Sequence, residues 1–279
     1  MGGPEMAPQT PQRSATPRQS RGIPRLFTGK VAVVTGAAGG IGRAVAVRLA
    51  AEGARLALVD VDANALSASR DAVKQAGGEA LTVTADVTRS ADVERYVRAT
   101  TDAFGGIDRF FNNAGILGAV APLIEYPEEM FDRVLAVNAK GVWLGMKHVA
   151  PAIIARGGGA IVNTASIAGL RGTPGLVAYT ASKHAVVGLT RSASLELIRR
   201  GVRVNAVCPA PIDTAMAADM EKKARPNDPA AFHARMEASV PMRRYGTADE
   251  VAALVTFLLS DEASYINGGI YPVDGGSMA

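Results

Sequence analysis

The stretch Val31–Gly42, with the sequence VAVVTGAAGGIG, decides the fold. Its first five residues form a short apolar run with β-branched side chains, which is typical of a buried strand. The glycines that follow turn the chain tightly. Residues 41–52 then place apolar side chains on one side of a predicted helix, namely Ile41, Val45, Leu49 and Ala50. The pattern therefore predicts a strand, a glycine turn and a helix in direct succession.

This glycine turn has the chemistry of a phosphate site. Glycines let the backbone approach a pyrophosphate, and the free N–H groups at the helix start favour its negative charge. The spacing Gly36-x-x-x-Gly40-x-Gly42 is one residue longer in its first gap than the ordinary dinucleotide fingerprint. A glycine-rich turn alone could be a structural loop. The flanking strand and helix favour dinucleotide binding.

The second predicted strand, residues 55–60, ends in Asp60, twenty-four residues after Gly36. A carboxylate at this point accepts hydrogen bonds from the ribose hydroxyls and repels a 2′-phosphate. No Arg or Lys lies between Gly36 and Gly42, and Val61 follows the acid. These residues predict NAD rather than NADP. The alternatives for Asp60 are a solvated turn residue or a helix cap, and Asp62 is a competing acid.

Tyr179 and Lys183 are four residues apart, and Ser166 lies thirteen residues before the tyrosine. Residues i and i+4 share one face of a helix. A Tyr with a pKa near ~10 is a poor base at neutral pH. A neighbouring cation favours the phenolate, so we expect Lys183 to lower the pKa of Tyr179. The pair alone is a weak signal, because such spacings also occur by chance on amphipathic helices.

Several further motifs occur in a fixed order, and together they resemble the short-chain dehydrogenase/reductase family from about Leu26 to the C-terminus. They are Thr35-Gly36-x-x-x-Gly40-x-Gly42, Asp86-Val87, Asn112-Asn113-Ala114-Gly115, Asn138, Ser166, Tyr179-x-x-x-Lys183 and Pro209-x-x-Ile212-x-Thr214. The resemblance implies an α/β Rossmann fold with a doubly wound, mostly parallel, seven-stranded sheet flanked by helices on both faces. Strands and helices alternate without a linker, so we expect a single domain over residues 26–279. Ala210 departs from the family, which has Gly there, and should mildly constrain the loop.

The resemblance also implies the roles of individual residues. The catalytic group comprises Asn138, Ser166, Tyr179 and Lys183. Cofactor binding is expected from Gly36, Gly39, Gly40, Ile41, Gly42, Asp60, Val61, Asp86, Val87, Asn113, Ala114, Gly115, Tyr179, Lys183, Pro209, Ile212 and Thr214. For Asp86 a helix cap near Ser90 is an equal alternative. The substrate is expected to contact Ser166, Ala168, Leu176, Tyr179, Pro211 and Met216.

In the implied mechanism NAD exchanges a hydride with a secondary alcohol or ketone while Tyr179 acts as general acid or base. Ser166 orients the substrate oxygen. Lys183 also binds the nicotinamide ribose, Thr214 binds the carboxamide, and Asn138 holds a water that relays protons to the lysine. The expected activity is an NAD-dependent dehydrogenase or ketoreductase of class EC 1.1.1.

The residues expected around the substrate are mostly apolar and uncharged, which favours a cyclic or hydrophobic alcohol or ketone. Met216 and Met220 could form an adaptable cover or belong to the core. The alternatives are a 3-oxoacyl-thioester reductase or a glucose-type sugar dehydrogenase of the same family. A cofactor-binding protein without turnover is disfavoured because all four polar groups are present. The helices that begin at Glu128 and Val177 are expected to pair between subunits, with a homotetramer favoured over a dimer.

The N-terminal residues 1–25 are rich in Pro, Gln, Ser and Arg and are expected to form a disordered extension. Five of the chain's 30 basic residues and one of its 26 acidic residues lie within positions 1–30, which leaves 25 of each in the body. The basic pI therefore comes from this segment and does not indicate nucleic-acid binding. The segment lacks the apolar region of a secretory signal, and its five prolines disfavour a transit helix.

Membrane and metal chemistry are also not expected. No apolar run reaches the ~18 residues of a membrane span. The single Cys208 excludes an intrachain disulfide and fits a reducing cytoplasm. The three His residues, at positions 148, 184 and 233, and the acids show no metal-ligand spacing.

Overall fold

The computed structural model describes residues 25–279. Its centre is a seven-stranded sheet with the strand order β3-β2-β1-β4-β5-β6-β7, in which all neighbouring strands are parallel. The order reverses between β1 and β4, which is the switch point where doubly wound sheets bind ligands. The strands are β1 Val31–Thr35, β2 Arg55–Asp60, β3 Glu79–Thr84, β4 Arg109–Asn112, β5 Gly159–Thr164, β6 Val202–Pro209 and β7 Ile270–Val273.

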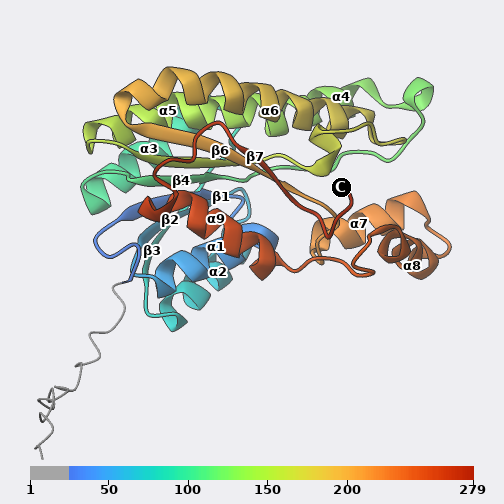
Figure 1. Cartoon of the computed structure of the whole chain (residues 1–279), viewed down its shortest axis with the longest axis horizontal. Helices are drawn as coiled ribbons and strands as arrows, with labels where there is room; N and C mark the ends of the chain where they lie inside the picture. The colour runs from blue at the N-terminus through green and yellow to red at the C-terminus, as the bar shows by residue number, and fades with distance from the viewer. Residues whose placement is uncertain (1–24) are drawn as a thin grey trace, which may run out of the picture.

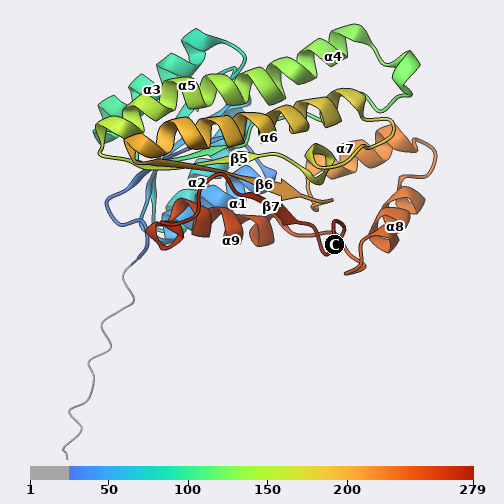
Figure 2. The ribbon, with the colours of Figure 1, turned by 45° about the horizontal axis from the view of Figure 1, so that its top comes forward.

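Helices cover both faces of this sheet (Figures 1 and 2). One layer contains α1 Gly40–Ala51, α2 Ala63–Gln75 and α9 Ala248–Leu259. The other contains α3 Ser90–Phe104, α5 Gly141–Ala155 and α6 Val177–Leu197, with α4 Glu128–Leu135 leading into α5. Two further helices, α7 Ala215–Ala224 and α8 Pro229–Ser239, extend beyond one end of the sheet, beside the C-terminus. The predicted Rossmann architecture is confirmed.

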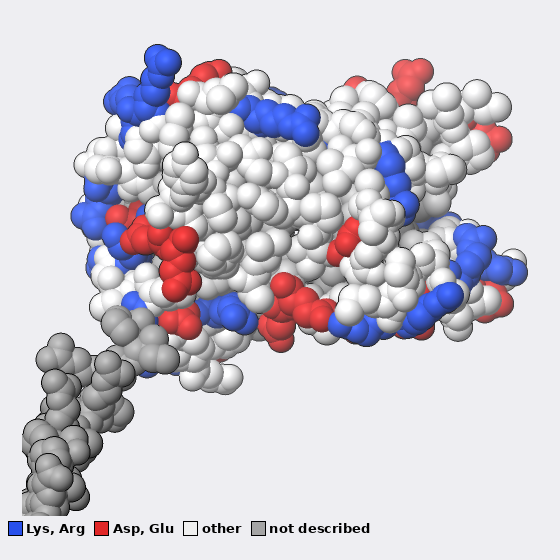
Figure 3. Space-filling model, viewed as in Figure 1, with Lys and Arg blue, Asp and Glu red and all other residues white. Residues whose placement is uncertain are grey.

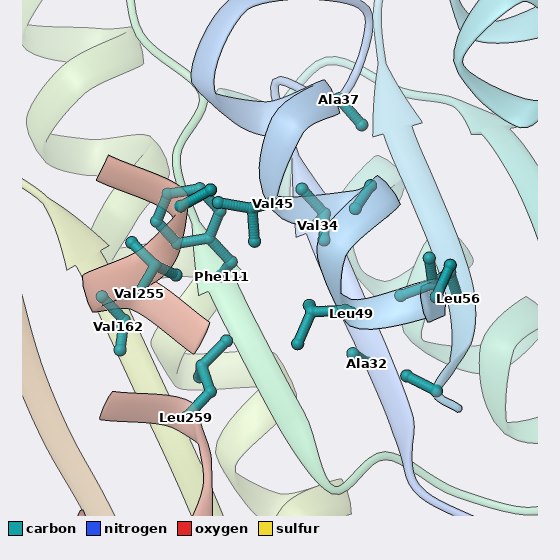
Figure 4. Packing of buried hydrophobic residues seen from close by; sticks show 14 of the residues in the cluster. Ala32, Val34, Ala37, Val45, Leu49, Leu56, Phe111, Val162, Val255 and Leu259 are labelled. Carbon is teal, nitrogen blue, oxygen red and sulfur yellow. The ribbon is translucent and has the colours of Figure 1, made fainter. Parts of the chain in front are cut away.

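The two helical layers enclose separate apolar cores. Figure 4 shows the first, where Val45 and Leu49 of α1 pack with Val255 and Leu259 of α9 over the sheet. The strands β1 and β2 contribute fully buried residues to it, as their apolar sequences predicted. The second core lies under α3, α5 and α6 and includes Tyr96 and Phe110. Burial of this much apolar surface is what fixes the sheet between its helices.

The helical segment that begins at Glu128 is interrupted by a π-helical turn, Ala136–Lys140, which contains the buried Asn138. Such turns are rare and occur often at functional sites. Pro151, in contrast, lies inside α5 and does not end it. The helix predicted over residues 41–52 is observed as α1, one residue earlier at each end, and the strand predicted over residues 55–60 is observed as β2.

Charges on the face shown in Figure 3 lie in small groups of both signs, mainly around its edge. Within residues 25–279 no helix has the length and apolarity to cross a membrane. The same residues contain no group of three His, Cys, Asp or Glu side chains that could hold a metal. The predicted disordered extension lies outside the described residues, apart from Arg25.

Near the amino end of β6, a buried arginine joins neighbouring segments of the chain through hydrogen bonds. Arg203 of β6 is 7% exposed, and burial lowers the pKa of its guanidinium. It donates to the backbone oxygens of Leu258 at 2.9 Å, Ser260 at 2.8 Å and Ile266 at 3.3 Å. These bonds tie the end of α9 and the segment before β7 to β6.

We expect Arg203→Met to lower the free energy of unfolding by about 2–4 kcal/mol, because buried carbonyls lose a charged donor. Arg98→Met is the matched control, since Arg98 is an exposed residue of α3, and it should change stability by less than about 0.5 kcal/mol. Urea unfolding of both variants measures the difference. Equal stability of the two variants would contradict this role for Arg203.

Candidate active site

A cavity of about 410 Å³ opens at the carboxyl ends of the strands. The glycine turn and Asp60 line one part of it, and Ser166, Tyr179 and Lys183 line another. The loop after β6 and the helices α7 and α8 supply the remaining wall. The sheet topology thus brings together motifs that are up to about 180 residues apart in sequence.

The conformation of the glycine turn leaves no room for a side chain at two of its positions. Gly36 has φ +64°, and a Cβ there would come within 2.8 Å of the Asn113 Nδ2 atom. Gly42 packs beneath the turn, where a Cβ would lie 2.0 Å from the Gly36 oxygen. Gly39, in contrast, has extended backbone with nothing within 4 Å of a Cβ. Glycine at 36 and 42 therefore lets the turn close against α1 and the loop after β4.

Asn113 fixes this turn to the neighbouring strand ends. Its backbone N–H donates to the Thr35 hydroxyl at 2.9 Å, and its side-chain amide donates to the Thr35 and Gly36 oxygens at 3.1 and 3.3 Å. The Thr164 hydroxyl donates to the Asn113 Oδ1 atom at 3.1 Å. Three strands, β1, β4 and β5, are thereby connected around the cavity.

Asp60 lies at the end of β2 and lines the cavity, as predicted. Its carboxylate accepts from the N–H groups of Ala38 at 3.1 Å and Asp62 at 3.2 Å. Asp62 has the other function considered for these acids: it caps α2 through the N–H groups of Asn64 and Ala65. The two neighbouring acids are therefore separated into a cavity group and a helix cap.

Ser166, Tyr179 and Lys183 meet at the opposite part of the cavity. Ser166 caps a short 3-10 turn, Ile167–Gly169, by accepting from the Ala168 N–H at 3.2 Å, and its hydroxyl donates to the Pro209 oxygen at 3.3 Å. Tyr179 and Lys183 lie on the first turns of α6, and the Lys183 ammonium is 5.5 Å from the centre of the Tyr179 ring. The predicted convergence of these side chains is observed.

The pKa of Tyr179 differs from the sequence prediction, because it is raised instead of lowered. Burial raises the pKa of Tyr179, and hydrogen bonding with Ser166 opposes that rise. The group that lowers this pKa is thus Ser166 rather than Lys183. Burial lowers the pKa of Lys183 to about 8, so the lysine is mainly an ammonium at neutral pH. At that pH Tyr179 is a neutral phenol, which can donate a proton.

Asn138 lies behind the cavity and does not line it. Its amide is fully buried, accepting from the Ile116 N–H at 2.8 Å and donating to the Ile116 oxygen at 2.8 Å and the Ser182 hydroxyl at 3.1 Å. Ser182 in turn donates to the Tyr179 backbone oxygen at 2.7 Å. Asn138 therefore connects the loop that contains Gly115 to the helix that carries Tyr179.

The wall formed by α7 and α8 is apolar on its inner side, where Met216, Met220 and Met236 line the cavity. On the outer side, His233 of α8 contacts Glu221 of α7 at 2.8 Å. The Tyr245 hydroxyl also donates to Glu221, at 3.0 Å. These bonds join the two helices to the segment before α9.

Most predicted cofactor and substrate residues line the cavity, including all six substrate positions. Five predicted cofactor residues do not: Gly42, Val61, Asp86, Val87 and Ala114. Val61 is 66% exposed, and the Asp86 carboxylate accepts from the backbone N–H and hydroxyl of Thr88. Asp86 is thus part of a turn and does not cap α3. Ala210 needs no left-handed backbone, and its N–H donates to the Val273 oxygen.

The six residues expected around the substrate are uncharged, but Arg171, which was not anticipated, also lines the cavity, as does Thr173. Ser239, Val240 and Ser277 also line it and were not anticipated. Only the position of Arg171 shortly after Ser166 could have indicated its presence. Ser277 lines the cavity because the C-terminal segment passes beside it. The course of that segment depends on tertiary packing, so no local sequence pattern predicts it.

Comparison with known proteins agrees with this geometry. A family model described as enoyl-(acyl carrier protein) reductase matches residues 36–278. Levodione reductase of Leifsonia aquatica is 47% identical over 255 residues, covering 91% of this chain and 96% of the relative.

The chain belongs to the short-chain dehydrogenase/reductase family.

Two further members extend the comparison. Cyclohexanol dehydrogenase of Acinetobacter sp. (strain SE19) is 41% identical, over 89% of this chain and 95% of that enzyme. A crystal structure of NAD+-bound xylitol dehydrogenase superposes with a TM-score of 0.87 at 41% identity, covering 90% of this chain and 99% of the other. The family resemblance inferred from the motifs is confirmed, and these similarities span nearly the whole described chain.

Two glycines provide a matched pair of variants, one in the turn and one outside the cavity. Gly42→Ala should weaken dinucleotide binding by about tenfold or more, because the new methyl group meets the Gly36 oxygen and must displace the turn. Gly188→Ala should leave NADH affinity unchanged, because Gly188 is an exposed residue of α6 outside the cavity lining and a Cβ there meets no atom within 4 Å. Fluorescence titration with NADH measures both affinities. An intact affinity in Gly42→Ala would show that the turn is less constrained than its packing indicates.

Proposed function

We propose that the protein transfers a hydride between NAD(H) and a secondary alcohol or its ketone, with a cyclic or hydrophobic substrate. One observation carries this proposal: Ser166, Tyr179 and Lys183 line the same cavity as the glycine turn and Asp60. Proton transfer and oxyanion groups thus lie within one enclosure with groups suited to a dinucleotide.

The residues present fit a dinucleotide. The turn around Gly36 and Gly42 has no room for side chains, which suits close approach of a pyrophosphate to the backbone. Asp60 would receive the adenosine ribose, and Lys183 and Thr214 would hold the nicotinamide half. Thr214 lies across from the turn, 3.4 Å from the position of a Gly40 Cβ. When bound, NAD supplies the group that accepts or donates hydride.

The proton-transfer role falls to Tyr179. Its neutral phenol is the form that donates a proton to a ketone oxygen during reduction, and it takes the proton back during alcohol oxidation. Ser166 would share that oxygen and stabilise the charge that develops on it. The hydrogen bond with Ser166, which opposes the rise of the Tyr179 pKa, favours the phenolate that remains after proton donation. Asn138 positions both the Gly115 loop and α6, and a water held near it would connect Lys183 to solvent.

The substrate class rests on the lining and on the relatives. The three methionines, Leu176 and Pro211 form apolar walls large enough for a ring. Levodione reductase and cyclohexanol dehydrogenase are named for cyclic ketone and alcohol substrates. The thioester and sugar alternatives are tested by following NADH absorbance with acyl-thioester, sugar and cyclic substrates in parallel.

We further propose a cytoplasmic homo-oligomer, with a tetramer favoured over a dimer. Its support is the apolar surface on the long helices: Trp143 of α5 is 44% exposed, and Leu195 of α6 is 75% exposed. Burial of such side chains between subunits would stabilise the assembly.

Tyr179→Phe should reduce kcat by about 10³-fold, because the ring remains while the proton donor is lost. NADH affinity should change by less than about threefold, since Asp60, Lys183 and the glycine turn are untouched. Tyr265→Phe is the control, because Tyr265 is fully exposed, and it should retain normal turnover. A substantial residual rate in Tyr179→Phe would contradict the assignment.

The choice of NAD is tested at the two neighbouring acids. Asp60→Ala should lower the ratio of kcat/KM for NAD+ over NADP+ by about tenfold or more, since it removes both the ribose acceptor and the charge that repels a 2′-phosphate. Asp62→Ala should leave the ratio within about twofold while reducing stability through loss of the α2 cap. An unchanged ratio in Asp60→Ala would reject this role of the carboxylate.

A further inference from the structure

Arg171 introduces a cation into the part of the cavity that was expected to be uncharged. It lies two residues beyond the end of the 3-10 turn that Ser166 caps, and its backbone N–H donates to the Ile167 oxygen at 3.1 Å. The turn that orients Ser166 therefore also fixes the main chain of Arg171. The two residues line the same cavity.

The guanidinium of Arg171 has spare hydrogen-bonding capacity. It has five N–H donors. Among residues 25–279, one side-chain hydrogen bond of Arg171 is observed, a 3.3 Å contact from Nη1 to the Ser277 oxygen, and no acidic side chain pairs with it. Ser277 also lines the cavity and Arg171 is exposed, so the guanidinium lies at the solvent-facing edge of the cavity.

The position of Arg171 separates it from the dinucleotide part of the cavity. Asp60 ends β2, whereas Arg171 follows β5, and β1 and β4 lie between these strands. The C-terminal segment next to Arg171 packs on the α8 end, where a Cβ on Gly275 would lie 2.7 Å from Val240, another lining residue. Figures 1 and 2 show the C-terminus at the same end of the sheet as α7. A molecule bound between Ser166 and α7 would thus have Arg171 near its end that faces the C-terminal segment, away from the dinucleotide part of the cavity.

We propose that Arg171 determines substrate specificity by binding an acceptor oxygen on the substrate, remote from the carbon that exchanges hydride. The favoured substrate is then a ring with two oxygen functions, one at Tyr179 and Ser166 and the other at Arg171. A planar guanidinium is suited to a carbonyl, hydroxyl or carboxylate oxygen. This proposal rests on the proposed function and specifies its substrate class.

The test compares three substrates in ketone reduction with NADH. They are cyclohexanone, the cyclohexane dione with carbonyls on opposite ring carbons, and the oxo acid in which a carboxylate replaces one of these carbonyls. The variants are Arg171→Leu and Arg171→Lys, with Arg98→Leu as an exposed control on α3. The values measured are kcat and KM for each pair.

We expect the wild-type protein to prefer the dione or the oxo acid over cyclohexanone in kcat/KM, and the preferred one identifies a neutral or an ionised acceptor. Arg171→Leu should lose about 10- to 100-fold on that substrate, mainly in KM, while its kcat/KM for cyclohexanone stays within about twofold. Arg171→Lys should recover part of the preference, and Arg98→Leu should retain it.

A purely structural role for Arg171, holding the C-terminal segment through Ser277, predicts equal losses for all three substrates. Equal losses would overturn the proposal, and so would an unchanged preference in Arg171→Leu. Failure of the proposed function has a different signature, because the wild-type protein would then reduce none of the three ketones with NADH.

Discussion

The buried ammonium of Lys183 is the constraint on which the site depends. A cation that is only 3% exposed is costly to desolvate, and its pKa is lowered to about 8 as a result. The Thr164 oxygen accepts from it at 2.7 Å, and the Tyr179 ring lies beside it. The fold must therefore hold β5 and α6 in a fixed relation, or the charge would be left without a partner.

Several structural features maintain that relation. Asn138, in the π-helical turn before α5, joins the Gly115 loop to Ser182 on α6. Asn113 joins the ends of β1 and β4 to Thr164, whose carbonyl receives Lys183. The glycine turn and the proton-transfer residues are thus coupled through one hydrogen-bonded group of strand ends. Arg203 and the apolar cores stabilise the opposite end of the sheet and leave this end open for ligands.

The sequence predicted the fold and most of the residues that line the cavity, because both depend on local patterns. These patterns are the apolar strands, the glycine spacings and the i, i+4 pair. It did not predict properties that depend on tertiary packing. The pKa of Tyr179 is raised because surrounding residues bury the phenol, and spacing alone does not reveal burial. One oxygen of the Asp86 carboxylate accepts from Thr88, and Asp86 is not among the residues that line the cavity. Arg171 and Ser277 meet across about 100 residues of chain, so their contact could not be read from either segment.

The most direct test of the account is a crystal structure of the protein with NADH and a cyclic ketone or ketone analogue. We predict that the ligand's carbonyl oxygen lies within hydrogen-bond distance of both the Tyr179 hydroxyl and the Ser166 hydroxyl, with the Lys183 ammonium against the nicotinamide ribose. A ketone oxygen bound away from Tyr179, or a nicotinamide ring outside the cavity that Tyr179 lines, would contradict the account.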